Sequence, residues 1–367
     1  MEIKTYNSAQ LNDLILSEQF DRMPVVPIST HRAISHIRNP RAEPNDTLMI
    51  IAYEHDEMIG YLGVLADRIY ATDGQSFKCG WLSCMWVNPT LRGRGIAKQL
   101  LATAFKDWNN HILVTEFTPE AKGLYDRSAN FSDLRTNEGL RCYLRFNLHE
   151  ILPKKNEKYK RYTSLLRLAD SIANVVVDLK LRYFPPSDHS SLRFEEVKRL
   201  YADENDYILS QSEHSIERRD VAELNWIMEY PWLVESAPTE ESKRYHFSSV
   251  SDRFQNVFVR MMKDDKIVGF IHLTIRDNHL KVPYLFFEKE HTRDVMEYIH
   301  SLMLTQNINM LTVFQPELIR YISDSSSPFI YKRAIKRNYI ISKVLDMHFS
   351  NKENLLIQDG DADCAFT

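Results

Sequence analysis

Two glycines flanked by arginines, Arg92-Gly93-Arg94-Gly95, form the stretch of this 367-residue chain that is best suited to bind a charged ligand. Because they lack a Cβ atom, Gly93 and Gly95 let the backbone turn sharply and approach a bound group closely. The free N–H groups of a helix that begins after such a turn attract anions, and the two arginines add positive charge. The stretch therefore predicts a phosphate-binding turn. It is neither a Walker loop, which needs Gly-Lys-Ser/Thr, nor the GxGxxG dinucleotide fingerprint, whose glycines are spaced differently.

A strand and a helix are expected to position this turn. Residues 77–87 (FKCGWLSCMWV) are aromatic and apolar, as in a buried strand, and Pro89 ends strand pairing because it lacks an N–H. Apolar residues then recur at a spacing of three to four from Ile96 to Trp108, while polar residues fall on the other side. We expect a buried strand, a glycine turn and an amphipathic helix in succession.

This succession resembles the GNAT acetyltransferase superfamily, whose R/Q-x-x-G-x-G/A signature matches Arg92 to Ala97. A V-x-P motif precedes the signature in that family, as Val87-Asn88-Pro89 does here. The resemblance implies an α/β fold with a mixed α+β sheet, and acetyl-CoA as co-substrate with its pyrophosphate on the amides of the turn. It implies that the cofactor is bound by Met85, Trp86, Val87, Arg92, Gly93, Arg94, Gly95, Ile96 and Ala97.

Residues 118–131 (TPEAKGLYDRSANF) are similar to the second signature of the family, in which a Leu-Tyr pair follows an Asn and an Ala. Thr118 stands in place of the Asn, and Tyr125 lies one residue farther from Phe131 than is usual. The resemblance implies that Tyr125 is the general acid, which protonates the thiolate of CoA as it leaves. A tyrosine packed on the helix face is the alternative interpretation.

The sequence identifies the general base less clearly. Many family members carry a Glu on the fourth strand, six residues before the valine of V-x-P, but this position is Trp81 here. The nearest carboxylates along the chain are Glu116, at the end of the next strand, and Asp126. Glu116 beside a buried cleft could have its pKa raised by desolvation and act as the base. An exposed glutamate at a strand end is an equally good interpretation.

The length of the chain predicts more than one domain. We expect a catalytic GNAT domain over residues 1–148, a helical connector over 149–187, a second domain over 188–350 and a polar tail over 351–367. Apolar residues from Tyr162 to Leu179 form one stripe of the connector, which should pack on one or both domains. Because a lysine-rich segment precedes this stripe, a helix that lies on a membrane surface is the rival interpretation.

The second domain is expected to be a degenerate GNAT-like copy. Residues 51–63 (IAYEHDEMIGYLG) align without gaps on residues 260–272 (RMMKDDKIVGFIH), so that Gly60 falls on Gly269. The order of the expected elements is also similar in the two halves, which predicts a duplicated fold. A chance similarity of two charged hairpins is the alternative.

The second copy is not expected to bind CoA. Acidic residues stand where the phosphates would need donors, and they would repel a pyrophosphate; they are Glu288, Glu290 and Asp294. The second half is then expected either to shape an acceptor pocket or to hold a homodimer.

Composition narrows the choice of partners and compartment. The chain has 46 Lys and Arg against 50 Asp and Glu and no long basic run interleaved with aromatics, so nucleic acid is not an expected partner. The first residues, MEIKTYNSAQ, contain no apolar h-region, and no apolar stretch approaches the ~20 residues of a membrane span, so we expect a cytoplasmic protein. The four cysteines lack metal-binding spacing, so we expect reduced thiols and no metal.

These features predict an acetyl-CoA-dependent N-acetyltransferase that acts on a primary amine of a small molecule, either an amino sugar or an aminoglycoside-like compound. The resemblance implies direct transfer, in which the strand from Met85 to Val87 holds the thioester and polarises its carbonyl. The competing hypothesis is a protein that binds CoA without catalysis, because Trp81 replaces the usual glutamate.

Overall fold

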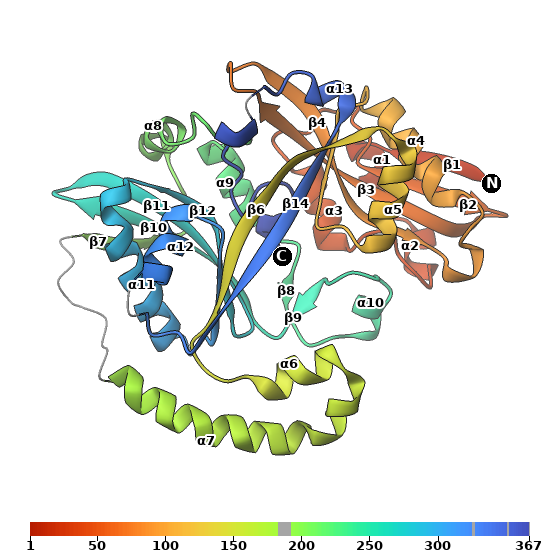
Figure 1. Cartoon of the computed structure of the whole chain (residues 1–367). Helices are drawn as coiled ribbons and strands as arrows, with labels where there is room; N and C mark the ends of the chain where they lie inside the picture. The colour runs from red at the N-terminus through yellow and green to blue at the C-terminus, as the bar shows by residue number, and fades with distance from the viewer. Residues whose placement is uncertain (183–191, 325–326, 351, 367) are drawn as a thin grey trace. The chain divides into compact units, whose positions relative to one another are not determined.

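The computed structural model describes residues 1–182, 192–324, 327–350 and 352–366 (Figure 1). The chain forms two compact units whose segments alternate along the sequence. Unit 1 is made of Met1–Asn137, Val197–Asn256 and Lys336–Thr367, and unit 2 of Glu138–Glu196 and Val257–Ile335. The boundaries expected at residues 148 and 350 therefore do not separate the two units, and the boundary expected at residue 187 lies outside the described residues.

Unit 1 contains a mixed sheet with the strand order β1-β2-β3-β4-β5-β14. Neighbouring strands are antiparallel, except that β4 and β5 are parallel. The strands are β1 (Glu2–Tyr6), β2 (Met49–Glu54), β3 (Glu57–Tyr70), β4 (Ser76–Val87), β5 (Ile112–Thr115) and β14 (Tyr331–Ser342). β2 and most of β3 are buried, so both faces of these strands are covered. The mixed α/β class expected from the sequence is confirmed.

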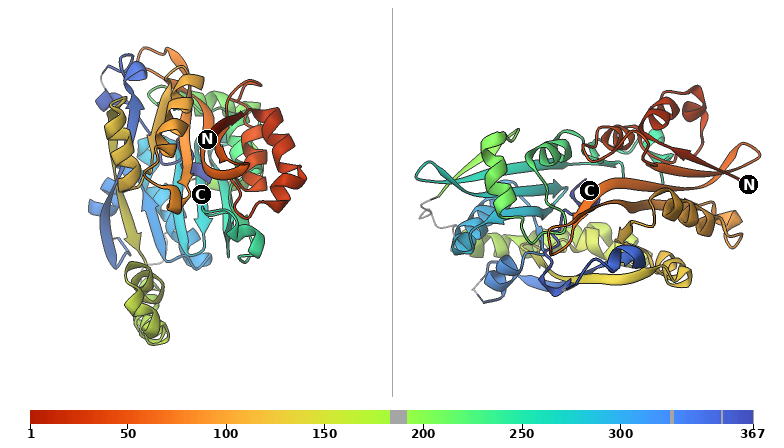
Figure 2. Two further views of the ribbon diagram at one scale, coloured as in Figure 1. Left: turned by 90° about the vertical axis from the view of Figure 1, so that its right-hand side faces the viewer. Right: turned by 90° about the horizontal axis from the view of Figure 1, so that it is seen from above.

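Helices lie on both faces of this sheet. In the right-hand view of Figure 2, α1 (Ser8–Ile15), α2 (Glu18–Arg22) and α3 (Thr30–Ile37) lie on one face, and α4 (Ile96–Asp107) and α5 (Pro119–Ser128) on the other. Asn7 and Gln10 form a capping box at α1, and the Thr118 side chain accepts a hydrogen bond from the amide of Ala121 at α5. Five residues of α4 are buried. Burial of each large aliphatic side chain among them adds about 1.5–3 kcal/mol to the stability of the fold.

Residues 197–256, which the sequence assigned to the second domain, belong to unit 1. They form α8 (Ala202–Ser210), α9 (Val221–Glu229), β8 (Val234–Glu235), α10 (Glu240–Lys243) and β9 (Val250–Ser251). The indole N–H of Trp226 donates to the backbone oxygen of Ser35 at 2.8 Å, and that of Trp232 donates to the Ser35 hydroxyl at 3.0 Å. These hydrogen bonds join the segment to α3.

Buried ion pairs also join this segment to the sheet. Arg219 contacts Asp67 at 2.7 Å and Glu217 at 2.5 Å, and all three side chains are almost completely buried. Arg41 pairs with Asp67 as well, and with Glu223 of α9. Replacing one of these charged residues would leave a buried charge without its partner. Such a replacement lowers the free energy of unfolding by about 3–5 kcal/mol.

The segment expected to be a polar tail is instead buried in unit 1, so that expectation is wrong. Ten of its described residues are buried: Leu355, Ile357, Gln358, Asp359, Gly360, Asp361, Ala362, Cys364, Ala365 and Phe366. The Phe366 ring stacks on Trp232 with 4.6 Å between centroids. Two of its carbonyls accept hydrogen bonds from side chains, because Asn137 donates to the carbonyl of Ile357 and Arg337 to that of Asp359, each at 2.8 Å.

The strands of unit 2 have the order β6-β13-β12-β11-β10-β7. The strands are β6 (Phe131–Tyr143), β7 (Arg193–Val197), β10 (Phe254–Lys263), β11 (Lys266–Arg276), β12 (His279–Phe287) and β13 (Met310–Val313). Its helices are α6 (Leu148–Lys155), α7 (Thr163–Arg182), α11 (Thr292–Thr305) and α12 (Pro316–Asp324). None of the helices in the described parts of the chain combines the length and apolar composition that crossing a membrane requires.

The expected connector corresponds to α6, a 3-10 helix over Glu157–Tyr162, and α7, all within unit 2. The apolar stripe of α7 does not pack as expected. Leu165 and Ile172 are each 63% exposed, whereas Val177 and Leu181 on another side of the helix are buried in the core of unit 2.

The last strand of each half of the chain pairs in the other unit. β6 follows α5 in sequence but pairs with β13, with Tyr143 opposite Met310. β14 follows α12 in sequence but pairs with β5, with Tyr339 opposite Thr115. The preceding elements have the same order in both halves, namely three strands, a helix, a strand, a helix and a strand.

Two glycines take the same place in this order. Gly60 of β3 lies opposite Val87, the last residue of β4, and Gly269 of β11 lies opposite Phe287, the last residue of β12. Gly269 thus has the strand position that the alignment with Gly60 predicted.

Candidate active site

The turn between β4 and α4 leaves room for a ligand next to free backbone donors. Gly93 and Gly95 have φ angles of 84° and 81°, values that favour glycine, and a Cβ atom at either position would meet nothing within 4 Å. The first hydrogen bond inside α4 runs from the amide of Gln99 to the carbonyl of Gly95. The amides of Ile96, Ala97 and Lys98 precede it, so they belong to the N-terminal donors of a helix, which favour an anion.

The two arginines of the turn differ in their surroundings. Arg92 is exposed. Arg94 makes two hydrogen bonds to the carboxylate of Glu54 on β2, at 2.6 and 3.0 Å. Part of the positive charge expected at the turn is therefore balanced by Glu54.

β4 separates from β5 before it reaches the turn. The parallel pairs between these strands run from Gly80 opposite Ile112 to Leu82 opposite Val114, and β4 continues for five residues to Val87. Its register against β3 also shifts here, and Cys84 has a φ angle of 56°. A bulge in β4 therefore turns this end of the strand and leaves backbone groups that could bind an extended ligand.

Met85, Trp86 and Val87, which the family resemblance assigned to the cofactor, lie on this end of β4 and are half-buried. The Trp86 ring stacks between Tyr61, at 5.5 Å between centroids, and His246, at 4.7 Å. The aromatic neighbours hold this part of the strand.

Tyr125 lies on α5 and is only 4% exposed. Its ring packs edge-on against Phe117 and Phe131, with centroid separations of 5.9 and 5.2 Å. Burial raises the pKa of Tyr125 to about 12, so the phenol keeps its proton at neutral pH. That protonation state suits a proton donor.

The structure does not give Glu116 the desolvated surroundings that the sequence suggested. Its side chain is 49% exposed and pairs with Arg337 at 2.8 Å. Asp126, the other carboxylate considered, is 59% exposed and pairs with Lys122. Trp81, in the place of the usual glutamate, is 1% exposed and packs edge-on against Tyr339. Glu116 and Asp126 are therefore exposed carboxylates held in ion pairs, and Trp81 has no side-chain group that could act as a base.

A buried polar cluster that the sequence did not reveal surrounds the bulge of β4. Arg32 of α3 donates to the Ser83 hydroxyl and to the Cys84 sulfur, each at 2.6 Å, and to the Tyr245 hydroxyl at 3.0 Å. The Arg32 guanidinium also lies 3.7 Å from the centroid of the Trp232 ring. Since these residues come from four distant parts of the sequence, no spacing connects them.

Asp363 completes this cluster, here called the Arg32 cluster (Arg32, Ser83, Cys84, Tyr245 and Asp363). The Ser83 hydroxyl donates to the Asp363 carboxylate, which is half-buried. Burial raises the pKa of Asp363, and Arg32 together with the Ser83 hydrogen bond opposes that rise only in part. Asp363 is thus a carboxylate with a raised pKa beside the bulge. The acidic composition of residues 359–363 suggested a solvated tail and so concealed it.

A cavity of about 230 Å³ adjoins the same cluster, because Tyr245 lines it. Its walls combine apolar side chains with hydroxyl groups, and its lining includes Phe20, Val26, Ile28, Ser29, Thr30, His31, Ser236, Thr239, Ser242, Ser249 and Val250. His31 is held by the backbone oxygen of Trp232 at 2.6 Å, and burial lowers its pKa. The cavity therefore offers apolar surface and several hydrogen-bonding hydroxyls.

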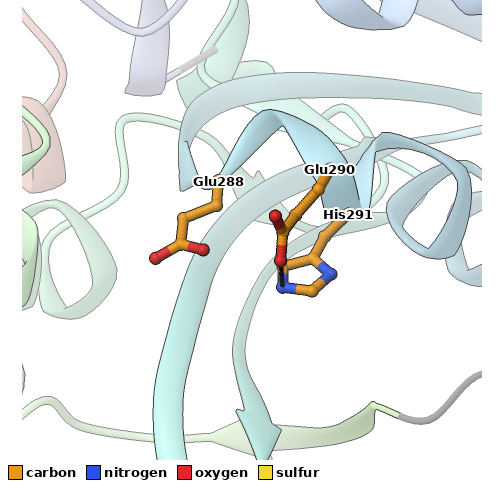
Figure 3. A group of neighbouring side chains, drawn as sticks. All are labelled: Glu288, Glu290 and His291. Atoms are coloured by element: carbon orange, nitrogen blue, oxygen red, sulfur yellow. Dashed lines mark ion pairs between the residues drawn. The ribbon is translucent and has the colours of Figure 1, made fainter.

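Unit 2 brings Glu288, Glu290 and His291 together, with one possible metal-ligand atom from each within 4.8 Å of the others (Figure 3). His291 lies 3.5 Å from Glu290 and 3.8 Å from Asp294. Glu288 and Glu290 are exposed, whereas His291 is buried. The cluster lies at the start of α11, which matches the place of the glycine turn before α4.

The model of the acetyltransferase (GNAT) family matches residues 12–131. These residues form a GNAT domain. The match includes the glycine turn, β4, β5 and Tyr125 of α5, whereas Tyr245 and Asp363 of the site described above lie outside it. No curated protein sequence matches the chain.

Two solved structures share the fold of this chain. A GCN5-related N-acetyltransferase from Anabaena variabilis ATCC 29413 has a TM-score of 0.51 at 13% identity, over 93% of this chain and 72% of that chain. A conserved protein of unknown function from Enterococcus faecalis V583, described as a probable N-acyltransferase, has a TM-score of 0.52 at 10% identity, over 94% and 73%. At these identities the likeness shows a common fold alone.

Proposed function

We propose that the GNAT domain transfers an acetyl group from acetyl-CoA to a primary amine of a small molecule. The observation that carries this proposal is the open turn at Gly93 and Gly95, which adjoins the end of β4 that extends past its pairs with β5. The pyrophosphate would be held by the turn and the thioester by the strand. The binding residues in this proposal are Met85, Trp86, Val87, Arg92, Gly93, Arg94, Gly95, Ile96 and Ala97.

Tyr125 is proposed as the general acid. As the C–S bond of the thioester breaks, the phenol would give its proton to the CoA thiolate, and it would regain one from the acylated nitrogen, which must lose a second proton to become an amide. This role is proposed from the place of Tyr125 in the second family signature. Burial raises the pKa of Tyr125 to about 12, which keeps the phenol protonated at neutral pH but makes it a weaker acid than a thiol, whose pKa lies near 8.5. The site must therefore lower the pKa of the phenol when CoA is bound for the proton to be given efficiently.

Asp363 is proposed as the general base. It would take a proton from the acceptor ammonium, whose nitrogen then attacks the thioester carbonyl. Ser83, which binds Asp363, lies two residues before Met85 and next to the bulge at Cys84, so Asp363 lies beside the end of β4 that is proposed to hold the thioester. Proton transfer would need the acceptor nitrogen within hydrogen-bond reach of Asp363 or one bridging water. Glu116 is the competing base, but its ion pair with Arg337 argues against it.

The cavity beside Tyr245 is proposed as part of the acceptor site. Its volume of about 230 Å³ is below the usual range of ligand pockets, roughly 300–1,000 Å³, and suits a small acceptor. Its serine and threonine hydroxyls can bind the hydroxyl groups of an amino sugar. A whole aminoglycoside would extend beyond it.

A screen of amines with acetyl-CoA, read by thiol release, tests the proposed function. Turnover with an amino sugar is the expected result. If acetyl-CoA binds but no amine releases thiol, the result supports the competing hypothesis of CoA binding without catalysis. The presence of Trp81 at the usual glutamate position already favours that hypothesis. If acetyl-CoA does not bind, both hypotheses are wrong.

We also propose that the reaction takes place in the cytoplasm. All four cysteines, Cys79, Cys84, Cys142 and Cys364, are free thiols. Free thiols are typical of reducing compartments.

We further propose that the second half of the chain is a degenerate GNAT copy. The matching order of elements, the equivalent places of Gly60 and Gly269, and the exchange of β6 with β14 support a duplication. The acidic turn from Glu288 to Asp294 would repel a pyrophosphate. This copy would therefore serve as a framework and not as a second CoA site.

A further inference from the structure

Helix α7 belongs to unit 2 and is labelled in Figure 1. It carries a row of large apolar side chains that are exposed. The row consists of Leu165, Leu168, Ile172, Val175, Val176 and Leu179, which are between 55% and 69% exposed. Another side of the same helix buries Asp170, Val177 and Leu181. α7 therefore has one side attached to the core of unit 2 and one apolar side that faces outward.

The spacing of this row is that of a helix-pairing seam. From Leu165 to Leu168, Ile172, Val175 and Leu179 the steps are three, four, three and four residues. Alternating steps of three and four place side chains at the a and d positions that interlock between two packed helices. A helix that faces a globular core usually has a wider apolar stripe.

The size of the row also points to a macromolecular partner. At roughly 100 Å² for each exposed aliphatic side chain, the six residues present about 600 Å² of apolar surface, the upper end for patches on a monomer. A standard protein interface buries about 800 Å² from each partner. The row alone would supply about three-quarters of that area.

The residues beside the row favour a protein partner over a membrane. Ser164, Ala169 and Ser171 flank it, and these small uncharged side chains let a second helix approach closely. A helix that lies on a membrane surface carries many lysines and arginines on its polar face. In this region most of the basic residues instead lie before the helix, in residues 154–161 (KKNEKYKR).

We propose that the exposed row of α7 is a self-association surface that packs against the same row of a second copy of this chain. A two-fold axis near Ile172 would make the two helices antiparallel and bring Leu165 of each copy near Leu179 of the other. The antiparallel arrangement keeps the two basic segments 154–161 at opposite ends of the pair, whereas a parallel one would bring these like charges together. This inference does not depend on the proposed enzyme activity.

Sedimentation or light scattering of the purified chain over a range of concentrations tests this proposal. We expect a dimer for the unmodified chain and a dissociation constant raised about 100-fold or more by Ile172→Asp, since one change places two buried carboxylates in the interface. The matched control is Leu16→Asp on unit 1, where Leu16 is 76% exposed; this variant should remain dimeric. Thermal unfolding should show that Ile172→Asp folds normally, because the residue is exposed.

Cross-linking gives an independent readout of the two-fold axis. Under mild oxidation Ile172→Cys should form a disulfide-linked dimer, whereas Leu16→Cys should not. A monomeric chain at all concentrations, or a dimer unaffected by Ile172→Asp, would overturn the proposal. A monomer that binds phosphatidylserine vesicles through the row, and loses that binding in Ile172→Asp, would assign the surface to a membrane instead.

Discussion

Gly95 precedes α4 with a φ angle of 81° and open space around it. Gly95→Glu would put a Cβ atom into the left-handed region, at a cost of about 1 kcal/mol or more, and place a carboxylate where the pyrophosphate is proposed to bind. We expect this variant to lose measurable acetyl-CoA binding in a calorimetric titration. Gly74→Glu is the matched control, since Gly74 has a φ angle of 85° and open space but lies between β3 and β4. Equal losses in both variants would mean that the turn is not the site.

Tyr125 allows a test of the proton donor that keeps its packing. Tyr125→Phe removes the hydroxyl but retains the ring that contacts Phe117 and Phe131. We expect kcat to fall by about 10²-fold or more, while the dissociation constant of acetyl-CoA stays within a few-fold. Steady-state kinetics and a binding titration check the two quantities separately. Full activity in this variant would mean that another group protonates the thiolate.

Asp363 and Glu116 can be compared as bases with two isosteric changes. The pKa of Asp363 is raised by burial, so its carboxylate is lost as the pH falls through a value above that of an ordinary aspartate. Activity should therefore fall on the acidic side of the pH profile. Asp363→Asn should lower kcat by about 10²-fold or more and remove this acidic limb, while Glu116→Gln should leave both nearly unchanged. The reverse pattern would identify Glu116 as the base.

At the scale of elements, the segment 355–366 is a structural part of unit 1. Phe366 is fully buried and stacks on Trp232. Phe366→Ala should lower the free energy of unfolding by about 3–5 kcal/mol, because it removes a buried ring and leaves a cavity. Denaturation followed by tryptophan fluorescence measures the change. Leu356→Ala, at a position that is 38% exposed in the same segment, should have a much smaller effect.

The strand, turn and helix of residues 76–107 were predictable because each carries a local signal. Gly93 and Gly95 supply positive φ angles, and the helical period of the apolar residues is complete over α4. The burial of residues 355–366 was not predictable, since their carboxylates are neutralised by residues distant in sequence. Arg337 pairs with Asp359 in this way. Local composition cannot reveal such partners.

The Arg32 cluster was hidden for a similar reason. Arg32, Cys84 and Tyr245 are contributed by α3, β4 and the segment after α10, and only the folded chain brings them within hydrogen-bonding distance. The same holds for α7, whose spacing predicted a stripe but not the side of the helix that packs. In both cases tertiary contacts, which the local sequence does not show, determine which side chains are buried together.

At the scale of the whole molecule, the proposed duplication leads to a test by stoichiometry. The turn in unit 1 is open and rich in donors, whereas the corresponding turn in unit 2 carries Glu288, Glu290 and Asp294. We expect saturating acetyl-CoA to bind at one molecule per chain in calorimetry, and this binding to vanish in Gly95→Glu. Two molecules per chain, one of them unaffected by Gly95→Glu, would contradict a degenerate second copy.

The exchange of β6 and β14 has a consequence for how the chain is made. During translation, β5 leaves the ribosome more than 200 residues before β14, its neighbour in the sheet. Residues 355–366, which fill the core of unit 1 and contribute Asp363, emerge later still. In the nascent GNAT domain, the edge of β5 that later pairs with β14 therefore stays unpaired while unit 2 is synthesised. Unpaired strand edges are prone to pair with wrong strands. Asp363, the proposed general base, is thus among the last residues to join unit 1.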